Sequence, residues 1–177
     1  RGKQVRITSP RVATDLGIGM VHQHFKLVHN FTVTDNIILG LEPQRWGIVS
    51  TGAAVRRIQE ISLRYGLNVD PDAKIEDITV GMQQRVEILK MLDRNADVLI
   101  LDEPTAVLTP QEVAELMKIM KSLTAEGKSI ILITHKLKEI KAVADRCTVI
   151  RRGKYIGTVT VAGTSAQELA EMMVGRK

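Results

Sequence analysis

Several features common in proteins are scarce in this chain. Aromatic residues make up 3% of its 177 residues, so the aromatic platforms on which nucleic-acid bases stack are almost absent. The formal net charge of +5 is spread along the sequence. Such a diffuse excess suits an anionic ligand, but it provides no basic stripe for DNA or RNA. The composition therefore argues against nucleic acid as a partner.

Cysteine and long apolar segments are scarce as well. The single cysteine, Cys147, excludes an internal disulfide and is typical of a reducing compartment. No apolar run reaches the ~20 residues needed to cross a bilayer, and no signal peptide is evident. The composition, 44% hydrophobic and 25% charged, is typical of a soluble globular domain. Because the chain begins with Arg1 rather than Met, we expect it to be a piece of a longer product.

The stretch ADVLILDEPTAV, residues 96–107, places four aliphatic residues directly before two acids, Asp102 and Glu103. A continuous apolar run predicts a strand that is covered on both faces, as in a parallel sheet. The two carboxylates then lie at the carboxyl end of the strand, where ligands bind in open α/β sheets. A solvated acidic turn is the alternative interpretation of this stretch alone.

Strand and helix patterns alternate on either side of this stretch. Residues 17–23 and 129–135 also read as strands. Between 102 and 129, Thr109, Pro110 and Glu112 form a capping box that begins a helix. A strand, a helix and a strand in this order predict a right-handed unit with parallel strands.

Residues 51–94 are predicted to be helical with no strand between them, because apolar residues recur at helical spacing before and after a turn at 70–72. A further helix at about 136–145, a hairpin over 148–159 that turns at Arg152-Gly153, and a capped helix from Thr164 to Gly175 complete the pattern. We therefore predict an α/β core over 1–29 and 96–177, with a helical subdomain over 30–95 inserted into it.

Three predicted strands end at one edge of the sheet. They deliver Gln23, then Asp102 and Glu103, then Thr134 and His135. This set of side chains suits a site for a polyphosphate and its metal ion. Asp102 and Gln23 can help to bind Mg²⁺. Glu103 can accept the proton of the attacking water, and His135 can contact the terminal phosphate.

At this point the motifs resemble the ATP-binding-cassette (ABC) ATPase domains of membrane transporters. VLILDEP resembles the Walker B strand followed by the catalytic glutamate, Glu103. Gln23 in GMVHQ resembles the Q-loop glutamine, and His135 in LITHK resembles the switch histidine. ITVGMQQRV, residues 78–86, stands in the place of the family signature. The resemblance implies a P-loop-NTPase-like α/β fold with a mostly parallel sheet, and it covers essentially the whole chain.

The signature segment departs from the usual LSGGQ form. Thr79 replaces the serine and keeps a hydroxyl, Val80 and Met82 replace a glycine and the glutamine, and Gly81 is retained. In the family, Thr79 and Gly81 would contact the nucleotide held by a partner cassette. A plain helix N-cap at Thr79 is the alternative. Thr109 replaces the aspartate of the family's D-loop, which leaves a role for that loop across a dimer open.

No GxxxxGK[ST] phosphate loop occurs in the 177 residues. The resemblance places that loop before the Q-loop, so the fold is predicted to be incomplete at the N-terminus. We expect this chain by itself to hydrolyse no ATP and to bind none in the micromolar range. The family's sheet has its phosphate-loop strand between residues 129–134 and 147–151. We therefore expect the chain to self-associate, swap segments or close its sheet in a rearranged order.

The resemblance is strongest to importers of nucleosides or simple sugars. It implies ATP and Mg²⁺ as cofactors and a position at the cytoplasmic face of the cell membrane. It further implies membrane permease subunits and a second ATPase cassette (in the same chain or a homodimer) as partners, and indirectly a solute-binding lipoprotein. The alternatives are sugar as cargo, a soluble ABC-type ATPase acting on nucleic acid or ribosomes, and a non-enzymatic scaffold.

Two features around Gln23 permit more than one interpretation. His22, His24 and His29 crowd this segment, and the first two would share one strand face. We expect these histidines to contact solvent or a membrane subunit. A zinc site is the less favoured interpretation, because it would require cysteine or another ligand at a suitable spacing. The apolar segment FKLVHNF, residues 25–31, either faces the membrane subunit, as the family implies, or packs on the protein's own helices.

Overall fold

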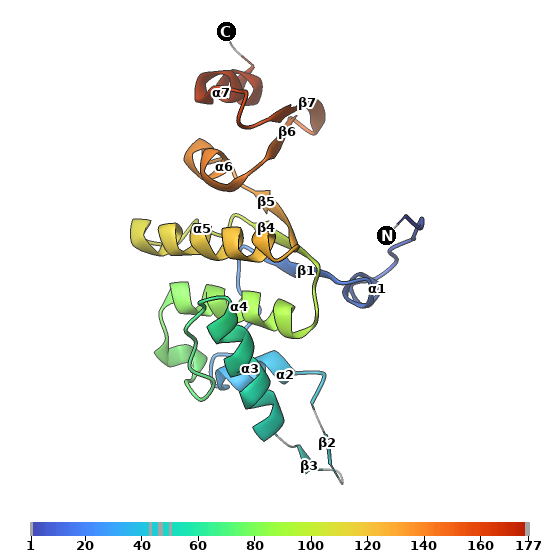
Figure 1. The fold of residues 1–177 in the computed structure, drawn as a ribbon, viewed down its shortest axis with the longest axis vertical. Coiled ribbons are helices and arrows are strands. Elements are labelled where there is room, and N and C mark those ends of the chain that lie inside the picture. The colour runs from blue at the N-terminus through green and yellow to red at the C-terminus, as the bar shows by residue number, and fades with distance from the viewer. Residues whose placement is uncertain (1, 43, 46–47, 50, 176–177) are drawn as a thin grey trace. The chain divides into compact units, whose positions relative to one another are not determined.

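A sheet in the order β1-β4-β5 positions the predicted site (Figure 1). Its strands are β1 (Ile18–Val21), β4 (Val98–Asp102) and β5 (Ser129–Ile133). β1 and β4 run parallel, in a register from Ile18 opposite Val98 to Val21 opposite Leu101. The three strands predicted from the sequence are therefore present, and the parallel pairing of β1 with β4 agrees with the predicted mostly parallel sheet.

This computed structural model describes residues 2–42, 44–45, 48–49 and 51–175. The chain divides into two compact units, the first extending to Ile131 and the second beginning at Leu132. The boundary falls within β5, which starts in the first unit and ends in the second. The division predicted from the sequence, with a core over 1–29 and 96–177, stays a prediction.

The burial of β4 differs from the prediction. Leu99 and Leu101 are each 1% exposed, whereas Val98 and Ile100, which alternate with them, are only partly buried. In β5, Ile131 and Ile133 are 52% and 45% exposed. The expectation of a strand covered on both faces is met only in part, because this alternation shows that one face of β4 is buried and the other is partly exposed.

Among the residues that the structure describes, the sheet is not closed in a rearranged order. Within the described ranges, β5 is the last strand of its sheet, and β6 (Arg146–Arg151) pairs with β7 (Lys154–Thr160) in a separate antiparallel sheet. The rearrangement that we considered from the sequence is therefore not adopted. Self-association and segment swapping stay predictions.

Helices dominate the segment between β1 and β4, as predicted. They are α2 (Val33–Ile38), α3 (Gly52–Arg64) and α4 (Val80–Asp93), with a single 3₁₀ turn at Ile75–Asp77. A short antiparallel pair, β2 (Gln44–Arg45) and β3 (Ile48–Val49), precedes α3 and was not predicted. A short helix before β1, α1 (Pro10–Asp15), was also not predicted, although Ser9 and Pro10 supply its N-cap and first residue.

The helical core is built from apolar residues that are shielded from solvent. Ile58 of α3 and Val86, Ile88 and Leu89 of α4 are each 0% exposed. At the periphery, Arg57 Nε of α3 donates to Asp93 Oδ1 of α4 at 2.5 Å. α4, which carries the signature segment, is thus fixed by packing along most of its length.

Removing side-chain volume from this core should destabilise the fold. Leu89→Ala should lower the free energy of unfolding by about 2–5 kcal/mol, because the substitution removes buried methyl groups and leaves a cavity. Urea denaturation measures this change. Leu63→Ala is the matched control, because Leu63 on α3 is 76% exposed. Equal losses for the two variants would contradict this account of the core.

The remaining elements follow their local sequence signals. α5 (Pro110–Ala125) begins with the predicted capping box, in which Thr109 and Glu112 bond each other's backbone N–H groups. α6 (Leu137–Val143) follows β5. The β6–β7 hairpin turns at Arg152 and Gly153 with φ values of 50° and 73°, as predicted. α7 (Ala166–Val174) is capped by Ser165 rather than Thr164, because Ser165 forms the capping box with Glu168.

Candidate functional site

The register between β1 and β4 brings two predicted site segments to the same edge of the sheet. Val21 lies opposite Leu101 at the ends of the two parallel strands. Gln23 and Glu103 are therefore each two residues beyond the last paired positions, and Asp102 is one. Gln23 is exposed, whereas Asp102 and Glu103 are partly buried. The roles assigned to these three residues stay predictions.

Glu103 has an unusual backbone conformation. Its φ of 46° lies in the left-handed region, which costs a residue with a side chain about 1 kcal/mol or more. Its carbonyl oxygen accepts a hydrogen bond from the Ala106 N–H at 3.2 Å, and Thr105 in the same turn is 1% exposed. A turn in which Pro104 and Thr105 are buried thus holds Glu103 in a strained conformation. Such strain is concentrated at functional sites.

The histidines near Gln23 are not arranged as predicted. β1 ends at Val21, so His22 and His24 lie beyond the strand and do not share a strand face. The expectation was wrong because the extended ladder stops where β4 reaches its acidic end. Across the described ranges, no group of three or more His, Cys, Asp or Glu side chains could hold a metal ion.

The segment after Gln23 packs on the protein's own helices. Leu27 is buried with 8% of its surface exposed. The Val28 N–H donates to Asn36 Oδ1 at 2.7 Å, and Asn36 Nδ2 donates back to the Val28 carbonyl at 3.0 Å. Phe31 is 36% exposed. These contacts support self-packing for Leu27 and Val28 in the segment FKLVHNF, and they leave Phe31 accessible.

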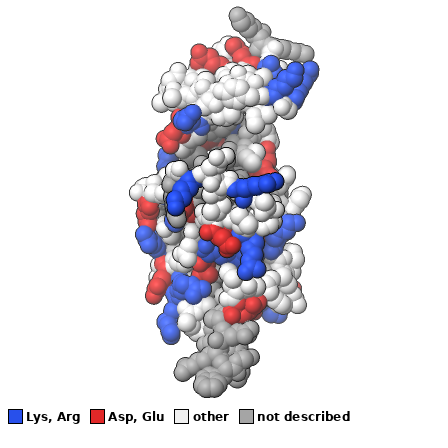
Figure 2. All heavy atoms as spheres, turned by 90° about the vertical axis from the view of Figure 1, so that its right-hand side faces the viewer, with Lys and Arg blue, Asp and Glu red and all other residues white. Residues whose placement is uncertain are grey.

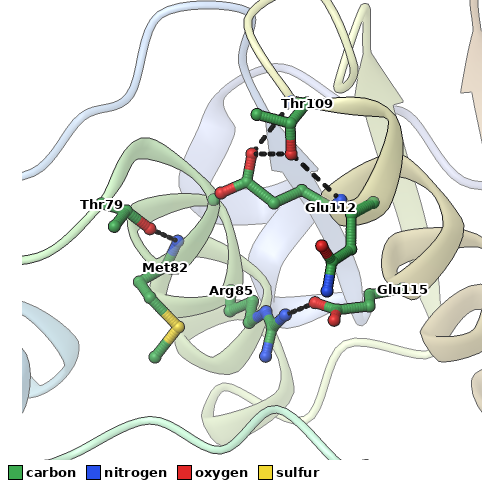
Figure 3. A pocket seen from close by; sticks show the side chains of 8 residues that line it. Thr79, Met82, Arg85, Thr109, Glu112 and Glu115 are labelled. Atoms are coloured by element: carbon green, nitrogen blue, oxygen red, sulfur yellow. Dashed lines mark hydrogen bonds and ion pairs between the residues drawn. The ribbon is translucent and has the colours of Figure 1, made fainter.

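The start of α4 forms the helix N-cap that was one interpretation of the signature segment. Thr79 is the N-cap, and its hydroxyl accepts a hydrogen bond from the Met82 N–H at 3.3 Å. Gly81 is buried in the first turn. A pocket of about 280 Å³ opens beside this turn (Figure 3). It is lined by Thr79, Gly81, Met82, Arg85, Thr109, Gln111, Glu112 and Glu115. The N-cap is therefore present, and it leaves room beside the helix start.

Glu112 reaches this pocket in a way that the sequence did not predict. Its Oε2 accepts hydrogen bonds from the N–H and the hydroxyl of Thr109, each at 2.9 Å. The same carboxylate lies against Gly81, where an added Cβ would overlap it. The pKa of Glu112 is lowered, mainly by the hydrogen bond from the Thr109 backbone N–H. The Thr109 hydroxyl, the charge of Arg85 and the Gly81 backbone lower this pKa further. One carboxylate thus contacts the N-termini of both α4 and α5.

Arg85 lies on the same side of α4. Its guanidinium forms an ion pair with Glu115 of α5 (Figure 3) and donates to the Leu67 carbonyl at 3.0 Å. The pocket is therefore lined by a cation from α4 and two carboxylates from α5. The capping-box pattern identified Glu112, but no local signal in the sequence indicated its contact with Gly81.

His135 belongs to the second unit. It follows β5 and is exposed. The turn around it is fixed by Thr134, whose hydroxyl donates to Glu139 Oε2 at 2.9 Å and accepts from the Lys136 N–H at 3.1 Å. Glu139 is 5% exposed. The chain thus presents His135 on an ordered turn, and its role stays a prediction.

Charged side chains of both signs are interspersed on the face shown in Figure 2. No large area of a single sign is visible there, in agreement with the diffuse net charge of +5. Among the helices that the structure describes, none has the length and apolar character needed to cross a membrane.

Comparison with known protein families gives a clear match. The family model described as ABC transporter matches residues 2–106. The chain is 65% identical over 176 residues to the nucleoside import ATP-binding protein NupA of Lactococcus lactis subsp. cremoris, and these residues are 99% of this chain and 35% of that protein. It is 63% identical over 177 residues to the guanosine import ATP-binding protein NupO of Bacillus subtilis, and these residues are 100% of this chain and 35% of that protein.

A glucose import ATP-binding protein of Haloferax volcanii is 48% identical over 204 residues, with 99% of this chain and 37% of that protein covered. The chain thus spans little more than a third of the length of these relatives. Among solved structures, the ADP conformation of the ATP-binding cassette MJ1267 matches with a TM-score of 0.74 at 20% identity, covering 93% of this chain and 67% of that one. This likeness supports the predicted α/β fold.

Proposed function

The chain belongs to the ABC transporter family, and we propose that the whole protein binds and hydrolyses ATP to energise import of a nucleoside. The observation that carries this proposal is the register that ends β1 and β4 together. It brings the Gln23 segment to the same sheet edge as Asp102 and the strained Glu103. Ligands bind at this edge in open α/β sheets.

Each predicted site residue has a role that suits its chemistry. Glu103 accepts a proton from the water that attacks the terminal phosphate of ATP, and His135 contacts that phosphate as its charge changes. The Asp102 carboxylate and the Gln23 amide oxygen suit Mg²⁺, which is typically bound by one or two carboxylates together with substrate phosphates and water. Mg²⁺, when bound, neutralises part of the phosphate charge.

Thr79 and Gly81 would act on a nucleotide held mainly by a second cassette. The first turn of α4 carries backbone N–H groups without helical partners, and the helix dipole favours an anion there. The buried position of Gly81 and the pocket beside it support this role. We therefore propose a second ATPase cassette as a partner, either in the same polypeptide or in a homodimer.

The nature of the cargo is inferred from the relatives. The relatives named for nucleoside and guanosine import are 65% and 63% identical, whereas the one named for glucose import is 48% identical. A nucleoside is therefore the proposed cargo and a simple sugar the alternative. The whole protein would work at the cytoplasmic face of the membrane with permease subunits and, indirectly, a solute-binding lipoprotein, but without nucleic acid.

Reconstitution tests this proposal directly. The whole protein would be assembled with its permeases in liposomes, and ATP hydrolysis and uptake of radiolabelled guanosine, ribose or glucose would be measured. We expect guanosine to be taken up at the expense of ATP. Uptake of a sugar alone would establish the alternative cargo, and hydrolysis that no solute accelerates would refute the import function.

His135→Ala should reduce turnover in the whole protein but not ATP binding. The imidazole is expected to contact the terminal phosphate as the transition state forms, so its loss should lower kcat by about 100-fold. Steady-state hydrolysis and titration with a fluorescent ATP analogue separate the two effects. His29→Ala, another exposed histidine, is the control. Weaker binding with unchanged turnover at saturating ATP would contradict the proposed role.

A further inference from the structure

Glu87 is a buried carboxylate in the middle of α4. It is 3% exposed, and its Oε1 accepts a hydrogen bond of 2.6 Å from the backbone N–H of Lys26, 61 residues earlier in the chain. Burial lowers the pKa of Lys90, one turn further along α4, and the charge of Glu87 opposes that effect. A buried charge is costly unless it is paired or hydrogen-bonded, so the contact with Lys26 is an integral part of this packing.

The hydrogen bond joins two segments that the proposed mechanism uses separately. Lys26 is three residues after Gln23, and Glu87 is six residues after Gly81, which is about 9 Å along the helix axis. α4 also packs on the strand that leads to Gln23, because a Cβ on Gly19 would approach Met91 Sδ to 2.9 Å. α4 therefore contacts the chain both before and after Gln23.

A second buried side chain holds the same segment to a different helix. Asn36 of α2 is 0% exposed and bonds both the N–H and the carbonyl of Val28. α2 does not carry the signature residues. Side chains of two helices thus hold the segment after Gln23, and of these two side chains Glu87 is the one on the helix that begins at Thr79 and Gly81.

We propose that Glu87 is a positioning residue that couples movement of the segment after Gln23 to the signature segment at the start of α4. This inference rests on the proposed function. A membrane subunit that displaces residues 24–28 would draw Glu87 with them through the Lys26 N–H. Because a packed helix moves as one body, Thr79 and Gly81 would shift relative to the nucleotide of the partner cassette.

The test compares variants of the whole protein, detached and assembled with its permeases. Glu87→Ala should reduce the stimulation of ATP hydrolysis by transported solute about fivefold or more, the size of a typical coupling between sites. The kcat and KM of the detached protein should stay within about twofold of wild type, well below that coupling effect. Glu87→Gln keeps an oxygen that can accept the Lys26 N–H, so it should retain most of the stimulation.

Asn36→Ala is the matched control, because it releases the same segment from α2 rather than from α4. It should lower the melting temperature and preserve the stimulation. Lys26→Pro removes the backbone N–H that donates the same hydrogen bond. It would be tested in place of Glu87→Ala if Glu87→Ala does not fold. The proposal would be overturned if Asn36→Ala lost as much stimulation as Glu87→Ala. It would also be overturned if Glu87→Gln lost the stimulation.

Hydrogen exchange provides a measurement that does not depend on transport. ATP binding to the detached wild type should slow exchange in residues 24–28 and also in the first turns of α4. In Glu87→Ala, ATP should protect residues 24–28 and no longer protect α4. Equal protection of α4 in both proteins would overturn the coupling. A wild type that no solute stimulates would refute the import function, and exchange would then decide the role of Glu87.

Discussion

Replacing Glu103 with glutamine should lower ATP turnover by the whole protein about 100-fold or more and leave ATP binding intact. Glutamine has nearly the same shape, so it can occupy the same strained turn after β4. It cannot accept the proton of the attacking water. A 100-fold loss corresponds to about 2.7 kcal/mol of transition-state stabilisation.

Turnover would be measured at saturating ATP with Mg²⁺, and binding with a fluorescent ATP analogue. Glu60→Gln is the control, because it removes an exposed carboxylate from α3, away from the sheet edge. Near-normal turnover in Glu103→Gln would remove Glu103 from the role of general base. Equal loss of binding would indicate that the residue supports the fold rather than the chemistry.

Gly81→Ile should abolish hydrolysis while a single subunit still binds ATP. A side chain at this position would overlap the Glu112 carboxylate and fill the space beside the first turn of α4, where a phosphate would approach the helix N-terminus. The nucleotide is expected to be held mainly by the other cassette. Its binding should therefore survive, and the closed two-cassette state should not form.

Gly52→Ile is the matched control for this substitution. Gly52 is also in the first turn of a helix, and an added Cβ there would meet no atom within 4 Å. Hydrolysis, ATP binding and ATP-dependent dimerisation would be measured for both variants. If Gly81→Ile lost binding and hydrolysis together, residue 81 would act through the structural core.

The sequence predicted the site residues through their order along the chain and through short-range signals. The apolar strand before Asp102 and Glu103, the strand before Gln23 and the segment at 78–86 were each visible as patterns. The sequence did not indicate the left-handed φ of Glu103 or the contact of Glu112 with Gly81. Glu87 was detectable only as a charge among apolar neighbours in VEIL.

The sequence by itself determined the features whose interacting groups are close in the chain. The capping box of Thr109 and Glu112 spans three residues, and the turn at Arg152-Gly153 requires only two left-handed residues. Such features form wherever the local sequence occurs, because their hydrogen bonds need little chain closure.

Only the tertiary structure decided which distant groups meet. The Lys26–Glu87 hydrogen bond spans 61 residues, and the alternating burial of β4 depends on which parts of the chain cover each face of the sheet. Closing such separations costs chain entropy that no local pattern records. Packing of the whole domain compensates for that entropy, so the partners of Glu87, Glu112 and Leu101 became known only once the chain was folded.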